Sequence, residues 1–249
     1  MIDNSYTDAD GDQIDNGNGG GSGNGDTVLA GDGDETVQSG DGTLSGHATL
    51  TDGSVVNFSN IEQIVCFVSR THIATVNGPH QIETLQSGDL VLTRDHGPQP
   101  VRWISCTTAP AVADLAPIQI SRGQFGATRD LLVSPQHRML YPGASTHFLF
   151  GDPEVLVAAS HLINDHSIRR QPGGLVTYYH LLPDQHHIIY AEGAATESFY
   201  PGDQALSALH DPIRRGLFTS APDLRYGRAS YGRTARKCLS GVESSILTQ

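Results

Sequence analysis

The sequence predicts an all-β protein with a short helical C-terminal tail, and three observations lead to this prediction. Glycine and proline are frequent, with 28 and 13 residues, while charged residues make up only 17% of the chain, a composition typical of loop-rich β proteins. Short runs of β-branched and aromatic residues alternate with turn residues every few positions. A helical spacing of apolar residues appears only late, in "GDQALSALHDPIRRGLF" at 202–218, where Asp203 is a candidate N-cap.

The negative charge is concentrated at the N-terminal end. Residues 1–65 hold 12 of the 27 acidic residues and no Lys or Arg, whereas residues 66–249 hold 15 of each sign. Such an acidic stretch repels nucleic acid and anionic membranes, so we expect neither as a partner and expect a cation, calcium, instead. No apolar run approaches the roughly 18 residues of a membrane span, and the first residues lack the regions of a signal peptide. We therefore expect no membrane span and a secreted or cell-surface protein that uses no N-terminal signal peptide, with a cytoplasmic location left open.

Residues 1–45 form an acidic segment rich in glycine. "DADGDQID" at 8–15 has carboxylates at alternate positions, and "GSGNGDTVL", "AGDGDETVQ" and "SGDGTLSGH" follow at a nine-residue period. Alternate carboxylates suit calcium coordination, and the repeats resemble the calcium-binding nonapeptides of RTX proteins, which fold into a parallel β-roll. A flexible Gly/Asp linker is the alternative. The candidate calcium ligands are Asp8, Asp10, Asp12, Asp26, Asp32 and Asp34.

Residues 46–65 are expected to form a β-hairpin that leads into the main domain. "TDGS" at 51–54 is a turn signal between two runs rich in β-forming residues. The second run leads towards Cys66, one of only three cysteines, with Cys106 and Cys238. Three scattered cysteines are too few for a disulfide framework or a zinc site with paired spacing, so Cys66 needs another explanation.

Cys66 begins a series of motifs that resemble a known family. It is followed by T-x-I-x-T at 71–75, L-x-x-G-D-x-V at 85–91, "LVSPQHRML" at 132–140 and "TYYHLLPDQHHIIYAEG" at 177–193. Together these motifs resemble the Hint superfamily of hedgehog and intein autoprocessing domains, in particular the bacterial Hint domains that follow acidic calcium-repeat segments. The resemblance extends from about Cys66 to Gly202, and it implies a pseudo-twofold β horseshoe.

The resemblance implies a reaction at the Val65-Cys66 peptide bond. In the family the first cysteine attacks the preceding carbonyl and converts the peptide bond into a thioester, an N-to-S acyl shift that needs help because the amide is resonance-stabilised. Ser134 and His137 have the T-x-x-H spacing of the family, with Ser in place of Thr. This match implies that His137 hydrogen-bonds and protonates the Cys66 amide nitrogen, while the Ser134 hydroxyl orients the amide.

The late motif supplies three histidines. Counted back from Gly193, His187 takes the place of the family's histidine and His180 that of its aspartate. By this match His180 is a candidate base for the Cys66 thiol. His186 is the rival of His187, because neighbouring residues in a strand point in opposite directions. A metal site formed by these histidines would lack an acidic or thiol ligand at fixed spacing, so we favour the Hint interpretation.

The family resemblance also implies cleavage without splicing. Inteins end in His-Asn followed by Cys, Ser or Thr, whereas the matching segment here, "TESFYPGDQ" at 196–204, has no Asn. The substrate in cis would be the chain's own N-terminal segment, the acceptor would be water or a small thiol or amine, and the chemistry would need no cofactor. The β-branched side chain of Val65 shields its carbonyl, so turnover is expected to be slow.

Two other function classes remain open at this stage. One is a catalytically silent Hint module that serves as a structural part of a secreted calcium-binding protein. The other is a cysteine hydrolase acting in trans, which would need Cys66 and His137 in an open cleft. The predicted organisation is an acidic RTX-like or linker segment at 1–45, a hairpin at 46–65, a Hint domain at 66–202 and a polar, helical tail at 203–249.

Overall fold

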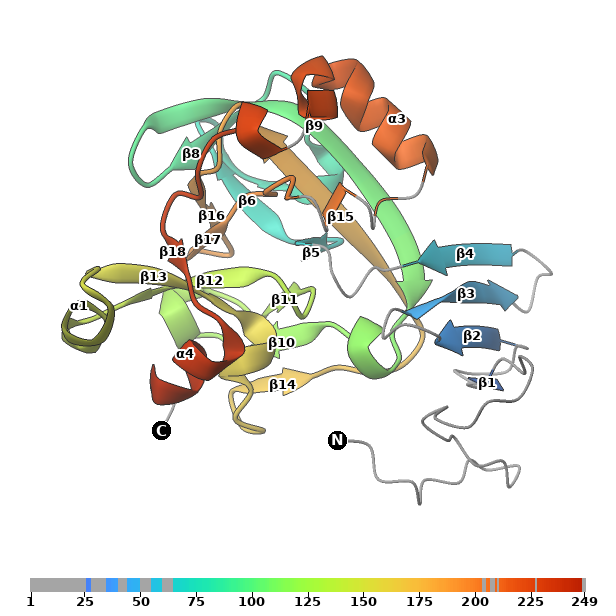
Figure 1. Cartoon of the computed structure of the whole chain (residues 1–249), viewed down its shortest axis with the longest axis horizontal. Helices are drawn as coiled ribbons and strands as arrows, with labels where there is room; N and C mark the ends of the chain where they lie inside the picture. Colours follow the sequence, from blue (N-terminus) through green and yellow to red (C-terminus); the bar gives the residue numbers. More distant parts are fainter. Residues whose placement is uncertain are drawn as a thin grey trace.

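The computed structural model describes residues 65–202, 205–206, 209, 211–226 and 228–247, together with the backbone of four earlier strands within 26–59. Most of the described chain is β-structure, and the large sheet curls into an open horseshoe (Figure 1). The prediction of an all-β horseshoe with a short C-terminal helix is therefore confirmed. No described helix is long and apolar enough to cross a membrane.

The large sheet has 14 strands, and its order places segments far apart in sequence side by side. The order is β14-β10-β11-β5-β15-β9-β8-β6-β16-β17-β12-β13-β18, and β7 pairs with β6. The strands are β5 (Phe67–Val68), β6 (His72–Thr75), β7 (Gly78–Gln81), β8 (Leu90–Thr93), β9 (Gly97–Pro110), β10 (Ile118–Ile120), β11 (Leu131–Val133), β12 (Arg138–Pro142), β13 (Glu154–Ala158), β14 (Ile168–Arg170), β15 (Leu175–Pro183), β16 (Ile188–Ala191), β17 (Ala194–Glu197) and β18 (Lys237–Cys238).

Two long strands, β9 and β15, form the antiparallel pair that runs along the molecule (Figure 1). Their register runs from Leu175 opposite Pro110 to Leu182 opposite Trp103, and it shifts before Pro183. Short helices lie around the sheet. The helices are α1 (Ala144–Phe150), α3 (Asp211–Ser220) and α4 (Gly241–Leu247), with 3-10 turns η2 (Ile82–Thr84), η3 (Ala113–Leu115), η4 (Gln124–Gly126), η5 (Ala159–Leu162), η6 (Pro222–Tyr226) and η7 (Arg228–Ser230).

A tight hairpin turn sets the register of β16 and β17. Glu192 and Gly193 connect the strands with φ angles of 48° and 86°, the positive values that a two-residue type I′ turn requires. A Cβ atom at Gly193 would lie 3.0 Å from the Thr128 side chain, so only glycine fits there without displacement. The turn places Thr196 opposite Ile189.

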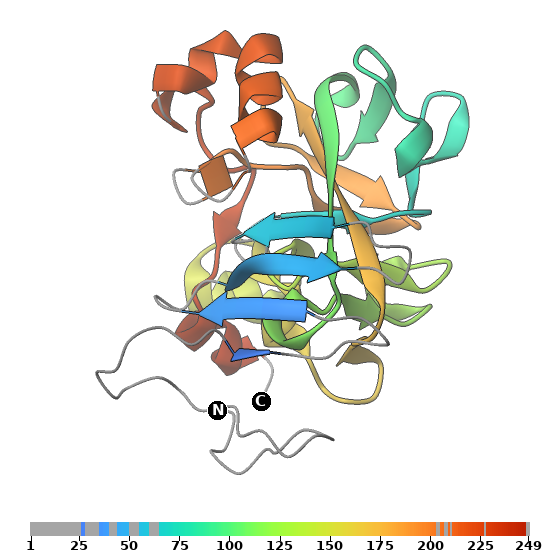
Figure 2. The same ribbon diagram turned by 90° about the vertical axis from the view of Figure 1, so that its right-hand side faces the viewer.

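The strands that precede residue 65 form a separate antiparallel sheet, β1 (Asp26–Thr27), β2 (Glu35–Ser39), β3 (Leu44–Thr49) and β4 (Val55–Ser59). β4 lies against β9 (Figure 2). The expected hairpin is present, since β3 and β4 pair with Thr49 opposite Val55. The parallel β-roll is wrong for these strands, because the pairs that they form are antiparallel.

Most of the candidate calcium ligands lie outside the described residues. Asp26 begins β1, of which only the backbone is described. The candidates outside the described residues are Asp8, Asp10, Asp12, Asp32 and Asp34. Calcium binding by this segment therefore stays a prediction.

The C-terminal tail packs into the domain and is not only helical. Its strand β18 pairs in parallel with β13, with Cys238 opposite Leu156, a pairing that the polar sequence did not predict. The helix α3 begins at Asp211, and the candidate cap Asp203 lies outside the described residues. Buried side chains of the tail, Leu206, Leu209, Leu217, Leu224 and Tyr231 among them, share one apolar cluster with Val65 and Cys66.

Candidate active site

Cys66 lies in the interior of the large sheet, at the entrance to β5. This two-residue strand pairs on one side with β11, through Val133, and on the other side with β15, through Tyr179. Cys66 is fully buried, and Val65 is 6% exposed. Because β5 lies between these two strands, Cys66 is next to the end of β11 and next to the middle of β15.

Ser134, the first residue after β11, holds the backbone of Cys66. The Cys66 N–H donates to Ser134 Oγ at 3.0 Å, and the Ser134 N–H donates to the Cys66 carbonyl at 3.0 Å. Ser134 is fully buried. Its hydroxyl is therefore in direct contact with the nitrogen of the Val65-Cys66 peptide bond.

His180, in β15, faces the thiol. Its Nδ1 lies 3.2 Å from Cys66 Sγ, and its ring stacks on Trp103 with centroids 6.0 Å apart and meets Phe199 at 5.4 Å. Burial lowers the pKa of His180 to about 4, and a hydrogen bond with the backbone of Val65 acts in the opposite direction. The imidazole is thus neutral at pH 7, and it contacts both residues of the candidate scissile bond.

The thiol is also neutral. Burial raises the pKa of Cys66 well above its usual value, and a side-chain hydrogen bond with Ser134 only partly offsets this. Cys66 and His180 therefore form a neutral thiol-imidazole pair and not a thiolate-imidazolium pair. A neutral thiol must lose its proton to act as a nucleophile, and His180 Nδ1 is within hydrogen-bond distance of it.

His137 makes a different contact from the one expected. The hydrogen bond that the structure shows for the Cys66 amide goes to Ser134, because a turn from Ser134 to the His137 N–H brings the serine against the amide. His137 Nε2 contacts Thr196 Oγ1, and its ring packs edge-on against Phe67 with centroids 4.4 Å apart. Burial lowers the pKa of His137 to about 4, although the nearby Glu197 acts to raise it.

His186 and His187 point to different environments. The His187 ring meets His96 with centroids 5.1 Å apart, and the His187 backbone N–H donates to Ser198 Oγ, so His187 contacts neither Cys66 nor Ser134 in the contacts described. His186 Nε2 lies 3.2 Å from the Glu197 carboxylate, and its Nδ1 accepts from the Ala235 N–H. The structure thus brings His180 to the thiol and directs His187 elsewhere.

Glu197 is a buried charge that sequence reasoning missed. It is fully buried and pairs with Arg138, whose guanidinium lies 3.3 Å away and whose backbone N–H donates to the carboxylate at 2.8 Å. Burial acts to raise the pKa of Glu197, but Arg138 and His186 outweigh burial and lower it. The available signal was a carboxylate shortly after Ala194 and Ala195 and shortly before Phe199, because such a group is buried only when it is paired.

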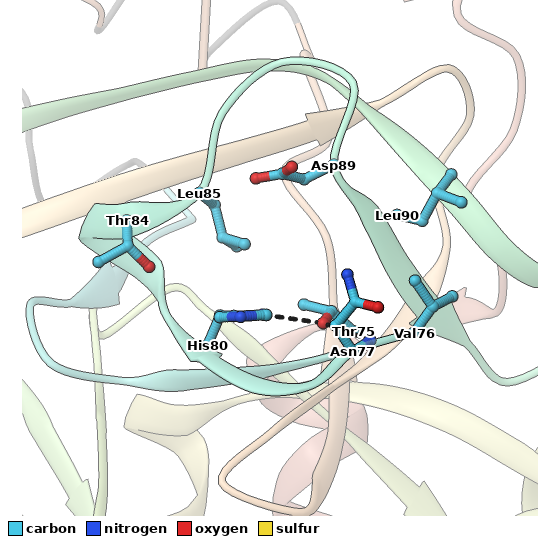
Figure 3. A pocket seen from close by; sticks show the side chains of 8 residues that line it. All are labelled: Thr75, Val76, Asn77, His80, Thr84, Leu85, Asp89 and Leu90. Carbon is cyan, nitrogen blue, oxygen red and sulfur yellow. Dashed lines mark hydrogen bonds between the residues drawn. The ribbon is translucent and has the colours of Figure 1, made fainter.

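Two surface hollows lie away from Cys66. One hollow has a volume of about 290 Å³, and His80 Nδ1 in its lining lies 2.9 Å from Thr75 Oγ1. Figure 3 shows the side chains that line it. A larger one, about 640 Å³, lies beside Tyr200 and the segment from Ala229 to Lys237. Neither is lined by Cys66, Ser134 or a residue that contacts the thiol, and no group of three or more potential metal ligands occurs among the described residues.

The sheet and the site together define a β domain that carries a buried cysteine at an internal peptide bond, held by a serine and a histidine from neighbouring strands. The family model of the Hint domain matches residues 65–203, more than half of the chain. The chain belongs to the Hint domain family. This membership supports a capacity for self-processing in general.

Several solved structures are similar to this chain. A bacterial intein-like domain from Clostridium thermocellum is 14% identical, with 53% of this chain and 96% of that chain covered and a TM-score of 0.38. The gp41-1 intein is 16% identical, with 53% and 97% covered and a TM-score of 0.35. The MchDnaB-1 intein is 13% identical, with 53% and 98% covered and a TM-score of 0.35. No curated protein sequence matches the chain.

Proposed function

We propose that the chain cleaves its own Val65-Cys66 peptide bond by an N-to-S acyl shift, without splicing. The observation that carries the proposal is the 3.2 Å contact between Cys66 Sγ and His180 Nδ1, beside a peptide nitrogen that donates to Ser134 Oγ. A nucleophile, a base and a hydroxyl that contacts the leaving nitrogen are the groups that this reaction needs.

In the first step a carbon-sulfur bond forms, a carbon-nitrogen bond breaks and one proton moves from the thiol to the departing nitrogen. The thiol proton passes to His180 Nδ1 as Cys66 Sγ bonds to the Val65 carbonyl carbon. The carbon-nitrogen bond then breaks, the Cys66 nitrogen gains one proton to become an amine, and Val65 remains as a thioester. The step is proton-neutral overall, because the thiol loses one proton and the amine gains one.

Ser134 is suited to assist the departing nitrogen. In the planar amide the nitrogen lone pair is delocalised, but it becomes available once the carbonyl carbon is tetrahedral. The Ser134 hydroxyl is then within 3.0 Å of the atom that must be protonated. It can hand its proton to the nitrogen, and the proton that left the thiol then restores the hydroxyl.

Water or a small nucleophile completes the reaction. Attack on the thioester releases residues 1–65, the acidic segment, and leaves a fragment that begins at Cys66. The segment 196–204 has no Asn, so cyclisation of an Asn side chain is not available as a second cleavage. Phe199 stands beside His180 in this segment, which keeps the site apolar.

The test uses the full chain and a thiol or hydroxylamine. We expect intact-mass measurements to show a fragment beginning at Cys66, with hydroxamate on Val65 when hydroxylamine is the nucleophile. The reaction should be first-order and independent of protein concentration, which separates it from hydrolysis in trans. Cys66→Ala is the matched control. Detection of only the intact chain, identical to Cys66→Ala under every condition, would refute the proposal.

A catalytically silent module is the second candidate, and the burial of the site favours it. Cys66 is fully buried and the pKa of its thiol is raised, so an acceptor reaches it only after the fold opens. In this case the domain would serve as a structural part of a secreted protein whose acidic segment binds calcium. A change in circular dichroism on adding calcium, without any cleavage by nucleophiles, would support this second candidate.

A further inference from the structure

The hydrogen bond between Thr196 and His137 determines where the imidazole carries its proton. Thr196 is fully buried in β17, opposite Met139 of β12 and Ile189 of β16. Its Oγ1 contacts His137 Nε2 and lies 2.9 Å from the Arg138 carbonyl oxygen. The imidazole nitrogen can donate or accept a hydrogen bond, whereas the carbonyl oxygen can only accept one.

The single hydrogen of the Thr196 hydroxyl determines the direction of both hydrogen bonds. The Thr196 hydroxyl has one hydrogen, and the Arg138 carbonyl can only accept, so this hydrogen points to Arg138. Towards His137 the Thr196 oxygen must then accept. The hydrogen of this second bond therefore belongs to His137 Nε2.

The other ring nitrogen of His137, Nδ1, consequently carries no hydrogen. Burial keeps the imidazole neutral, with a pKa of about 4, so the ring carries one hydrogen only. His137 Nδ1 is buried and has no hydrogen-bond partner among the described residues. It lies on a ring that packs against Phe67, the residue after Cys66. The lone pair of Nδ1 is thus held in the interior without a donor among the described residues.

We propose that Thr196 is a positioning residue that fixes His137 as the Nε2–H tautomer and so reserves Nδ1 to take up a proton. The role in the acyl shift rests on the proposed function. At rest His137 can only accept at Nδ1, so any proton it gives to the Cys66 nitrogen must first be taken up there. In the proposed first step the thiol proton goes to His180, so it reaches His137 Nδ1 only after His180 releases it, and its transfer to the amine keeps the step proton-neutral.

The charges around His137 are consistent with a proton that stays on Nδ1 only briefly. Burial has the largest effect and opposes the protonated ring, as do Arg138 and His186, whereas the Glu197 carboxylate favours it. Thr196 can keep accepting from Nε2 in both states of the ring. The imidazole therefore gains and loses its Nδ1 proton without exchanging the partner of Nε2.

The experiment reads the tautomer directly. The full chain is labelled with ¹⁵N-histidine, its imidazole resonances are recorded near pH 7, and His137→Gln identifies the signals of His137. We expect a protonated Nε2 and an unprotonated Nδ1. An Nδ1–H tautomer in the wild-type chain would overturn the proposal, even if Thr196 variants failed to fold.

Two substitutions separate positioning from packing. Thr196→Val keeps the shape but removes the accepting oxygen, so we expect a mixture of tautomers and thiol-induced cleavage slowed about tenfold, the effect of one hydrogen bond. Thr196→Ser keeps the oxygen and should restore both readouts. An unchanged tautomer in folded Thr196→Val would contradict the proposal. If the tautomer behaves as expected but no variant cleaves, the positioning by Thr196 stands and the proposed cleavage fails.

Discussion

Cys66 Sγ lies 3.2 Å from His180 Nδ1, although 114 positions separate the two residues in sequence. The contact arises because β5 is inserted between β11 and β15, which brings the start of the domain against the middle of a late strand. Both partners are buried and uncharged at rest. The site therefore holds a neutral thiol and a neutral imidazole in contact in the interior, with the proton still on the sulfur.

Replacing His180 should remove most of the cleavage activity. A positioned general base contributes about a hundredfold or more, so His180→Gln should slow thiol-induced cleavage by at least about that factor. His187→Gln is the matched control, because His187 contacts His96 instead of the thiol. Cleavage rates from intact-mass time courses distinguish them. Equal loss in both variants would mean that the contact between His180 and Cys66 does not carry the chemistry.

Removing the Ser134 hydroxyl should affect both stability and cleavage. Ser134→Ala leaves the buried Cys66 N–H without this acceptor, which costs about 1–3 kcal/mol of unfolding free energy. Ser134→Thr keeps the oxygen, and we expect it to cleave even if the added methyl lowers stability. Urea unfolding and cleavage rates measure the two effects. Normal cleavage by Ser134→Ala would exclude the hydroxyl from proton transfer to the nitrogen.

Stability should fall as the pH is lowered from about 6.5 towards 4. The pKa values of His137 and His180 are lowered to about 4 in the fold, so the unfolded chain binds protons first in this range. Each histidine contributes up to about 3 kcal/mol that is present above pH 6.5 and lost as the pH approaches 4. Urea unfolding across this range should show the loss, and the double variant with Gln at both positions should show a flatter profile.

The lowered pKa of His180 also predicts how the cleavage rate depends on pH. Because His180 stays neutral down to about pH 4, its basic form is present throughout the range from pH 5 to 8. We expect no step in the cleavage rate near pH 6.5, the ordinary value for histidine. A clear loss of rate centred there would show that a histidine with an ordinary pKa controls the reaction.

The C-terminal tail should control access to the thiol. Leu217 of α3 is fully buried in the apolar cluster that contains Cys66. An ion pair between Arg102 of β9 and Asp223 also connects the tail to the large sheet. Leu217→Ala should weaken this packing by about 2–5 kcal/mol and raise the alkylation rate of Cys66 at least about tenfold. Val242→Ala is the control, because Val242 is 77% exposed in the same tail.

Peptide mapping after iodoacetamide treatment measures this access with an internal reference. Cys106 is exposed and should react at once in every variant, whereas Cys66 should react only when the fold opens. Equal rates for the two cysteines in the wild-type chain would contradict the burial of the site. A similar increase in Leu217→Ala and Val242→Ala would show that access does not depend on the packing of α3.

The sequence contained the information on residue types and on local structure. The frequent turns between short β runs predicted the β class, and "TDGS" predicted the hairpin between β3 and β4. The motifs singled out Cys66, Ser134 and His180, which the structure brings together. These features depend on local turn chemistry and on residue order, which can be read along a single chain.

Which side chains are in contact depends on the tertiary structure. The sequence assigned His137 to the Cys66 amide and His187 to the site, but strand pairing gives the amide to Ser134, directs His137 to Thr196 and turns His187 towards His96. Contacts of this kind depend on register between distant strands, since a shift of one residue reverses the face on which a side chain lies. The packing of the tail over Cys66 and the buried pair of Glu197 and Arg138 arise in the same way. The motifs alone indicated the class of the domain and singled out Cys66, whereas the fold determined which imidazole contacts its thiol, the charge state of that thiol and its access to solvent.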